Sequence, residues 1–252
     1  MSAEPVGATV HADELPDHGS ARSSIDRLLS AAVPLLLGGV LLRLIVTGRY
    51  RDYVKPSMWP WLTLAGLALI VAATWQLAAR RAVDAGHRPA VSWLLLLPVA
   101  IVIGFEPGAL GSAALDSATR PIARISADGH WARLARDGNP VEMTIGEFVD
   151  RTHAGDTTTG VPVRLTGFVA PDEDGSSRFR VVRFRISCCA ADAAPVAVRV
   201  VGDVTAVPAT DSWVEITGTL EPDAPAALEP RLRVATLRPF ARPAAPYESV
   251  VR

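Results

Sequence analysis

The chain has 252 residues, of which 49 % are hydrophobic and only 20 % are charged, and its mean hydropathy is +0.25. This composition is more apolar and less charged than that of an average soluble domain, and it favours a membrane portion. The formal net charge of -1 does not call for nucleic acid or an anionic membrane surface as a partner, and two cysteines exclude a disulfide framework. Stability must therefore come from an apolar core and from the bilayer.

The N-terminal residues 1–27 are mostly polar and mix acidic residues with Pro, Gly and Ser. They show neither the basic start nor the apolar centre of a signal peptide. The sequence therefore predicts a disordered tail.

Three apolar stretches follow, at 28–48, 57–79 and 89–105, within a predicted membrane region. A hydrocarbon core needs about 20 apolar residues. The first stretch is long enough, although it contains Arg43 near its end, where a long side chain can reach the interface. The second is uncharged and carries tryptophans near both ends, as membrane helices do. The third is near the lower length limit and contains Pro98. We expect about three transmembrane helices.

The orientation of these helices is not decided by arginines and lysines, which divide evenly between the two sides. Arg43 favours an inside position for the loop that follows it. The long polar tail without a signal peptide favours an inside N-terminus. With three spans, an inside N-terminus predicts a multi-pass protein of the cell membrane whose C-terminal domain is extracytoplasmic.

Residues 106–129 form a predicted linker, and the β domain that follows spans residues 130–252. Short β-rich segments bounded by turn-rich segments predict a small all-β domain, best fitted by an OB-like barrel. The predicted strands are 161–169, 178–187, 195–202, 211–220 and 230–240. Ahead of them, 144–152 is predicted to be a short helix, with Thr144 as N-cap and Glu147 at the capping-box position. The fold class is thus an α + β membrane protein, with N-terminal transmembrane helices and a C-terminal barrel.

The second predicted strand has an irregular pattern, because its apolar positions change parity between Val181 and Val182. A β-bulge or a sharp bend there would return one face to the core and place four arginines together on the outer face. These arginines are Arg178, Arg180, Arg183 and Arg185. Such a face could bind single-stranded nucleic acid, but a solvated strand face is the favoured interpretation.

The only two cysteines, Cys188 and Cys189, are adjacent, and Asp192 follows three residues after the second. Zinc sites usually use Cys-x-x-Cys spacing. Adjacent cysteines on a continuing strand point to opposite faces, so both can meet one ion only where the strand ends and turns. The alanines around Asp192 and the proline at 195 indicate such an end. A zinc or copper(I) ion held by Cys188, Cys189 and Asp192, or a histidine in place of the acid, is therefore one interpretation.

Two other interpretations of the cysteines stay open. A vicinal disulfide would be an easily reduced switch. Alternatively, one or both thiols are small buried hydrophobes, and Asp192 is a cap or a turn acceptor. The sequence holds no phosphate-binding glycine loop, nucleophile elbow or paired helical histidines, so we expect no enzyme and no catalytic residues.

Five segments together resemble a bacterial membrane family, the YcgQ-type accessory subunits of two-component permeases. They are "YVKPSMWPWL" (53–62), "LLLPVAIVIGFEPGALGS" (95–112), "FRISCCAADAAPVAV" (184–198), "WVEITGTL" (213–220) and "PAAPYES" (243–249). The resemblance covers about residues 30–250, and its most specific part is Cys-Cys-x-Ala-Asp-Ala. It implies association with a separate polytopic permease of the YcgR/YraQ type, and it assigns no catalytic residue.

The first functional hypothesis is thus a membrane-anchored accessory subunit that binds a permease or its substrate through the β domain. Three helices are too few for a transport pathway of their own. The alternative is a metal-binding or metal-delivery protein that uses the vicinal cysteines. A structural envelope protein is a further alternative. The expected partners are the permease and the lipid bilayer, without nucleic acid.

Overall fold

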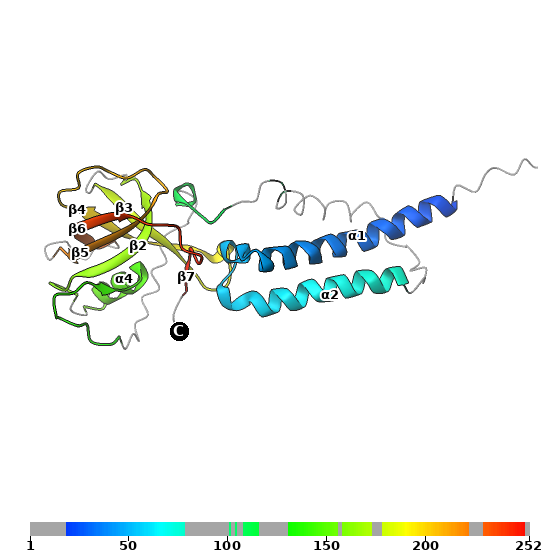
Figure 1. The fold of residues 1–252 in the computed structure, drawn as a ribbon, viewed down its shortest axis with the longest axis horizontal. Coiled ribbons are helices and arrows are strands. Elements are labelled where there is room, and N and C mark those ends of the chain that lie inside the picture. The colour runs from blue at the N-terminus through cyan, green and yellow to red at the C-terminus, as the bar shows by residue number, and fades with distance from the viewer. Residues whose placement is uncertain are drawn as a thin grey trace, which may run out of the picture. The chain divides into compact units, whose positions relative to one another are not determined.

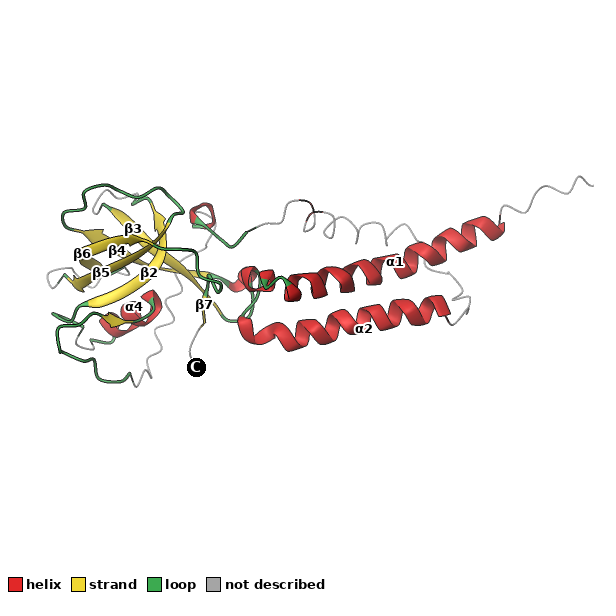
Figure 2. Cartoon of the chain, in the orientation of Figure 1, coloured by secondary structure: helices red, strands yellow, loops and turns green. Residues whose placement is uncertain are grey.

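The computed structural model describes residues 19–78, 101, 104, 108–115, 131–155, 158–172, 178–221 and 229–249, with side chains from residue 31 onward. The chain divides into two compact units. The first comprises Met1–Val40 and Ala65–Phe105, and the second comprises Leu41–Leu64 and Glu106–Arg252. The loop between the two long helices therefore belongs to the same unit as the C-terminal β domain (Figures 1 and 2).

The two long helices are α1 (Gly19–Val46) and α2 (Trp59–Ala78). Helix α1 begins inside the predicted tail, so residues 19–27 are helical, while residues 1–18 lie outside the described part of the chain. The reason is that extending an existing helix adds one hydrogen bond per residue fixed, whereas starting one is costly. The apolar segment of α1 can therefore support further turns ahead of it.

One helix in the described part of the chain, Pro56–Ala78 with its leading 3-10 turn, is long and apolar enough to cross a membrane. It coincides with the second predicted span. The apolar portion of α1, Ala31–Val46, is shorter than a full span. The third predicted span, 89–105, lies outside the described residues apart from positions 101 and 104. Three transmembrane helices thus stay a prediction.

Within the first unit, α1 and α2 approach closely at two glycines. A Cβ on Gly38 would lie 2.7 Å from the carbonyl oxygen of Gly66 and 2.8 Å from Cγ1 of Ile70. Close approach of helix backbones through small residues is typical of helices that associate in membranes. The contact therefore explains why Gly66 is buried while Leu64 and Leu67 are exposed.

Five strands of the C-terminal domain form a closed barrel (Figure 1). They are β2 (Val163–Ala170), β3 (Phe179–Ile186), β4 (Ala194–Val201), β5 (Trp213–Leu220) and β6 (Arg231–Pro239). They are arranged in the order β2-β5-β6-β4-β3, and β3 pairs again with β2. Only the β4–β6 pairing within this ring is parallel. The five predicted strands are confirmed, and the closed barrel is compatible with the predicted OB-like fold.

The barrel strands bury two apolar clusters. The first cluster fills the barrel and includes Phe179, Val181, Val198 and Ile216. The second includes Phe168, Val182, Phe184 and Tyr247. In both β2 and β3, residues of opposite parity belong to different clusters, so both faces of these strands are covered over part of their length.

This double burial explains the irregular pattern of β3 without a bulge. The pairing of β3 with β4 runs without a register shift from Phe179↔Val200 to Arg185↔Ala194, so the bulge expected between Val181 and Val182 is wrong. Side chains alternate regularly along the strand. Arg180 therefore lies on one face and Arg185 on the other, and a single face of arginines does not form.

Residues 108–115, which the sequence assigns to a linker, cover part of the second cluster. Leu110 and Leu115 pack against it. Ser112 is fixed by Asp211, which accepts hydrogen bonds from the Ser112 backbone N–H at 2.6 Å and from its hydroxyl at 2.9 Å. This segment is therefore part of the folded domain.

Helix α4 (Ile145–His153) closes one side of the barrel, and its N-terminus is fully satisfied. Thr144 is the N-cap, as predicted, and its Oγ1 accepts a hydrogen bond from the Glu147 N–H at 3.0 Å. The Glu147 side chain does not complete the capping box, since it pairs with Arg151 instead.

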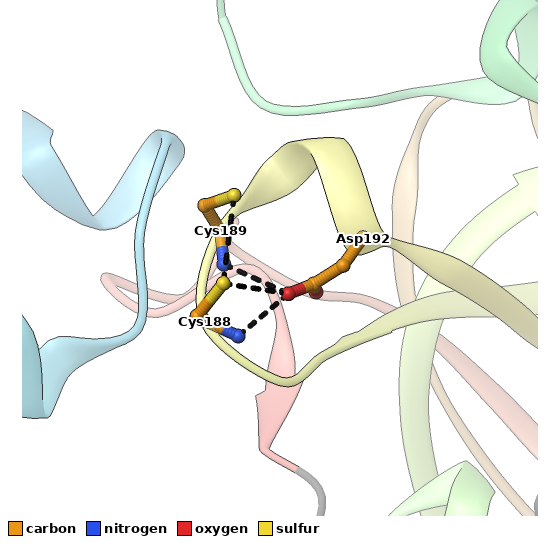
Figure 3. Close-up of side chains that lie close together, drawn as sticks. All are labelled: Cys188, Cys189 and Asp192. Atoms are coloured by element: carbon orange, nitrogen blue, oxygen red, sulfur yellow. Dashed lines mark hydrogen bonds between the residues drawn. The ribbon is translucent and has the colours of Figure 1, made fainter.

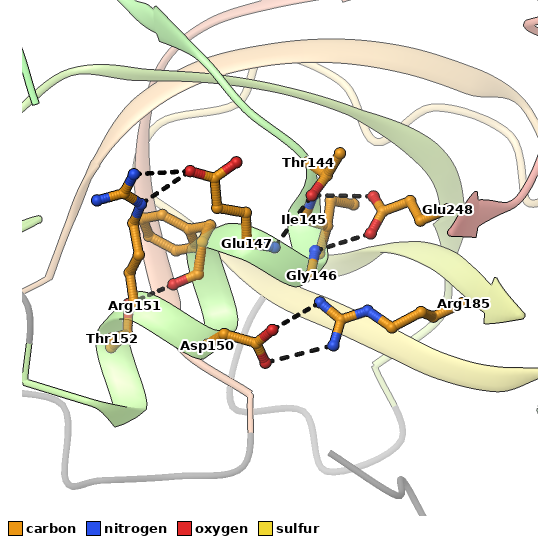
Figure 4. Close-up of polar contacts among 10 residues, drawn as sticks. Thr144, Ile145, Gly146, Glu147, Asp150, Arg151, Thr152, Arg185 and Glu248 are labelled. Carbon is orange, nitrogen blue, oxygen red and sulfur yellow. Dashed lines mark hydrogen bonds and ion pairs between the residues drawn. The ribbon is translucent and has the colours of Figure 1, made fainter. Parts of the chain in front are cut away.

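The first two N–H groups of α4 donate to a distant carboxyl group, that of Glu248 on the short strand β7 (Glu248–Ser249). Ile145 N–H donates to Glu248 Oε1 and Gly146 N–H donates to Oε2, both at 2.9 Å (Figure 4). Strand β7 lies parallel to the end of β3, where Arg185 pairs with Glu248 in register. The C-terminal segment is thereby attached to both the helix and the barrel.

Two arginines of β3 complete this buried polar region. Arg185 forms a two-point ion pair with Asp150 on α4, with Nη2 to Oδ2 at 3.0 Å (Figure 4). Arg183 donates to the carbonyl oxygens of Ala245 and Pro246. Burial lowers the pKa of Arg183, and the nearby charge of Glu248 partly offsets this effect. These arginines therefore hold the domain together.

Candidate metal centre

Cys188 and Cys189 lie in the tight connection between β3 and β4. Strand β3 ends at Ile186, a single 3-10 turn covers Ala190–Asp192, and β4 begins at Ala194. The strand therefore ends and turns at the cysteines, which is the condition under which adjacent thiols can face one ion. Figure 3 shows both cysteine side chains and the carboxylate of Asp192 on this connection, the β3–β4 turn.

Asp192 organises the β3–β4 turn by accepting several hydrogen bonds. Its Oδ1 accepts from the Ser187 N–H at 2.8 Å. Its Oδ2 accepts from the Cys188 N–H at 2.8 Å and, at 3.3 Å, from the Cys189 N–H (Figure 3). Asp192 is thus a turn acceptor, which was the alternative to its role as a ligand. The same bonds fix the direction in which its carboxylate points.

The three candidate ligand groups are close together. Sγ of Cys188 lies 2.9 Å from Oδ2 of Asp192 and 3.7 Å from Sγ of Cys189. One ligand atom from each of the three residues lies within 4.8 Å of the other two. Cys188 and Asp192 are exposed and Cys189 is half-buried, so an ion in solution can reach them. Within the described residues, this is the one cluster of three or more His, Cys, Asp or Glu side chains arranged in this way.

The hydrogen bond between Cys188 and Asp192 changes how both groups titrate. The bond to Asp192 and the contact with Cys189 raise the pKa of Cys188 to about 11. Burial raises the pKa of Asp192, but the hydrogen bonds from Cys188 and from the turn N–H groups lower it more, so the net shift is downward. At neutral pH the turn thus holds a protonated thiol against an ionised carboxylate.

This arrangement weakens two of the earlier interpretations. Reactive cysteines have lowered pKa values, so a raised pKa does not favour Cys188 as a redox nucleophile. Exposure of the Cys188 side chain also argues against packing in the core as its role. Metal binding is the interpretation that rests on geometry, because two thiols and a carboxylate lie together on one accessible turn.

We expect the alkylation rate of Cys188, followed against pH by peptide mapping, to rise with a midpoint near pH 11. In Asp192→Asn the midpoint should fall toward the ordinary value of 9.0, because the carboxylate no longer accepts the thiol proton. The raised pKa also means that the bond stabilises the turn fully below the ordinary thiol pKa and is lost as pH rises through about 11. The exposed Asp203→Asn is the control, and an unchanged profile in Asp192→Asn would refute the assignment.

The β3–β4 turn is attached to the α1–α2 loop, residues 47–58, by main-chain contacts. Val54 and Cys189 form an antiparallel β-bridge. The Lys55 N–H donates to the carbonyl oxygen of Cys188 at 3.0 Å. Both cysteines therefore have backbone positions set by the loop that leads into α2.

Further contacts hold the same loop on the barrel. The Ala190 N–H donates to the Tyr53 carbonyl at 2.7 Å. The Tyr247 hydroxyl donates to the Asp52 carbonyl at 2.9 Å, and Arg242 pairs with the Asp52 carboxylate. The chain thus brings together two segments far apart in sequence around the cysteines.

The structure brings together all three predicted ligand residues, Cys188, Cys189 and Asp192. Sequence reasoning missed the attachment of the α1–α2 loop to the turn. Its signal was weak, since a single "YVKP" segment between two apolar stretches looks like any interfacial loop. It also missed Glu248, an acid in the C-terminal segment that no periodic pattern marks.

In a comparison with known protein families, residues 151–248 match the family described as the DUF1980 C-terminal domain. The match covers the barrel, the β3–β4 turn and Glu248, and it ends before the last four residues of the chain. No curated protein and no solved structure shows significant similarity to this chain.

Proposed function

We propose that the protein is a membrane-anchored barrel protein that binds a thiophilic metal ion at Cys188, Cys189 and Asp192. The observation that carries this proposal is the convergence of two thiols and a carboxylate within 4.8 Å on one ordered turn. Cysteine sulfur is the ligand that zinc and copper(I) prefer in proteins. Anchoring rests on the apolar helix Pro56–Ala78.

The turn is pre-organised for an incoming cation. The Asp192 carboxylate is already held by main-chain N–H groups, so binding does not have to order it. The cation takes the place of the thiol proton between Cys188 and Asp192. Metal binding therefore releases protons, and affinity rises with pH through the acidic and neutral range.

Metal analysis of the full-length protein tests this function. The protein is purified in detergent without chelator, beside the Cys188→Ser/Cys189→Ser double variant and the control Asp203→Asn, which alters an exposed acid outside the cluster. We expect close to one ion per chain in the wild type and in the control. The double variant should retain none. Wild-type protein that binds neither zinc nor copper(I) after reconstitution would contradict the proposal.

A second function is favoured by the attachment of the α1–α2 loop to the barrel. A main-chain bridge between Val54 and Cys189 joins the candidate centre to the segment that precedes the apolar helix α2. Together with the resemblance to YcgQ-type proteins, this supports a role as an accessory subunit of a YcgR/YraQ-type permease. In that role the OB-like barrel contacts the permease or captures its substrate.

Native-membrane purification tests the accessory role. We expect a polytopic membrane protein to co-purify with the chain and to be cross-linked from positions in the barrel. A lone, monodisperse product would exclude the accessory role. A structural envelope protein predicts neither a partner permease nor bound metal.

A further inference from the structure

We infer that the ion is a tetrahedrally coordinated divalent cation of the zinc class, held by three protein ligands with a fourth position open to exchange. This inference rests on the proposed metal-binding function and specifies its ion and its use. It is carried by the spacing of the donors, by their chemistry and by their number.

The spacing of the two sulfurs fits a tetrahedral ion. In a tetrahedral zinc site with metal–sulfur bonds of about 2.3 Å, two sulfurs lie about 3.8 Å apart. The Cys188 and Cys189 sulfurs are separated by 3.7 Å. A linear two-coordinate copper(I) ion would place them on opposite sides, separated by roughly twice a metal–sulfur bond, or about 4.6 Å. The spacing of the thiols therefore matches a tetrahedral edge and is shorter than a linear copper(I) ion requires.

The third ligand points to the same class of ion. Copper(I) prefers soft sulfur ligands, whereas a carboxylate oxygen suits zinc and harder cations. Oδ2 of Asp192 lies 2.9 Å from Sγ of Cys188. A sulfur–oxygen edge of a tetrahedral zinc site is about 3.5 Å. Separation of this pair by roughly half an ångström, as the thiol proton leaves, would make one such edge. The Cys189 sulfur, within 4.8 Å of the carboxylate, would have to move closer to make the other.

The binding step balances without any oxidant or reductant. The cation binds two thiolates and one carboxylate, and the protons of Cys188 and Cys189 pass to the solvent. No electron is transferred. Two protons are therefore released for each ion bound from the protonated state.

The number of ligands indicates exchange. Structural zinc sites have four protein ligands, whereas sites that react or exchange keep a position for water or substrate. In the described part of the chain the cluster consists of three residues, and two of them are exposed. The fourth position faces the surroundings of the turn. A donor from another protein can occupy it before the ion is passed on.

Cobalt(II) is the probe that tests the geometry, because tetrahedral and octahedral cobalt differ strongly in visible absorption. Full-length protein in detergent is titrated with Co²⁺, and the bound Co²⁺ is then displaced by Zn²⁺. We expect one Co²⁺ per chain, intense tetrahedral ligand-field bands and a sulfur-to-cobalt charge-transfer band. Two protons should be released, as measured in weakly buffered solution.

Variants assign the ligands in the same assay. Cys189→Ser should lose much of the charge-transfer intensity. Asp192→Asn should weaken Zn²⁺ binding at least tenfold. The sulfur-to-cobalt charge-transfer band should persist, because both cysteines are still present. Asp203→Asn should match the wild type. Circular dichroism establishes that each variant keeps the barrel, and if Asp192→Asn unfolds, Cys189→Ser alone decides the sulfur assignment.

The outcomes separate this inference from the proposed function. Binding of copper(I) with no binding of Co²⁺ or Zn²⁺, or weak octahedral cobalt spectra, would overturn the inference and leave metal binding intact. Absence of binding for all three ions would overturn the proposed function itself. Transfer of Zn²⁺ to a competing chelator within minutes is expected for an open position, and retention over days would contradict it.

Discussion

Replacing Glu248 with alanine is expected to destabilise the barrel domain by about 3 kcal/mol, because each buried N–H left without an acceptor costs about 1–3 kcal/mol. The N–H groups of Ile145 and Gly146 would both lose their acceptor. Glu248 is only 5 % exposed, so water does not replace it. Thermal and urea unfolding of the full-length protein, followed by tryptophan fluorescence, measures the loss.

Two companion variants control this experiment. Glu248→Gln keeps one acceptor oxygen and should lose less stability than Glu248→Ala. Glu142→Ala removes an exposed acid from the short strand β1 (Val141–Glu142) and should change stability by no more than about 0.5 kcal/mol. Equal stability of Glu248→Ala and Glu142→Ala would show that the helix cap does not contribute.

Glu248 also determines whether its contribution to the stability of the domain rises or falls with pH. Burial raises the pKa of Glu248, and Arg183 together with the two helix N–H groups only partly offsets this effect. A carboxyl group whose pKa is raised in the folded state stabilises most below its unfolded pKa and loses that contribution as pH rises through its folded pKa. In Glu248→Gln this component of the pH profile should vanish.

Substituting Gly218 by alanine is the second variant with a large expected effect, a loss of about 2–3 kcal/mol. A Cβ at this position would lie 2.4 Å from the carbonyl oxygen of Arg233 and 3.1 Å from Cγ of Leu232. Because the nearest atom belongs to the backbone of β6, it cannot move aside as a flexible side chain would. The β5–β6 pairing shifts register between Thr217 and Gly218, so the glycine lies at this irregularity.

Gly108→Ala is the matched control, since a Cβ there meets nothing within 4 Å. Its free energy of unfolding should lie within about 0.5 kcal/mol of that of the wild type. Urea midpoints of the two variants make the comparison. If Gly218→Ala were as stable as Gly108→Ala, the irregular β5–β6 pairing at Gly218 would have to relax to accept the extra carbon.

The sequence carried enough information for the strands of the barrel and for helix α4. The strands are bounded by segments rich in Gly, Pro and Asp, and their β-branched content marks them clearly. The cap at Thr144 followed from local chemistry alone, because the side chain bonds three residues ahead. Local patterns were thus sufficient wherever the stabilising contact is itself local.

Non-local contacts were not predictable in the same way. The parity change in β3 suggested a bulge because a second buried face was not expected. The segment "GALGSAAL" has no pattern that predicts the packing of Leu110 and Leu115 against the outer face of the strand. The contact of Asp52 with Tyr247 spans 195 residues. No short-range period encodes such a pairing. For the candidate centre, the sequence supplied the ligands and the turn, and the structure supplied their distances.

The main-chain bridge between Val54 and Cys189 also constrains how the chain can thread a bilayer. The residues just before α2 and the barrel lie on the same side of any membrane that α2 crosses, because they are hydrogen-bonded to each other. If α2 crosses a membrane, the barrel lies on the side of its N-terminal end, Trp59, and opposite its C-terminal end, Ala78. The compartment that holds the α1–α2 loop is then also the compartment whose redox potential and metal supply the two thiols meet.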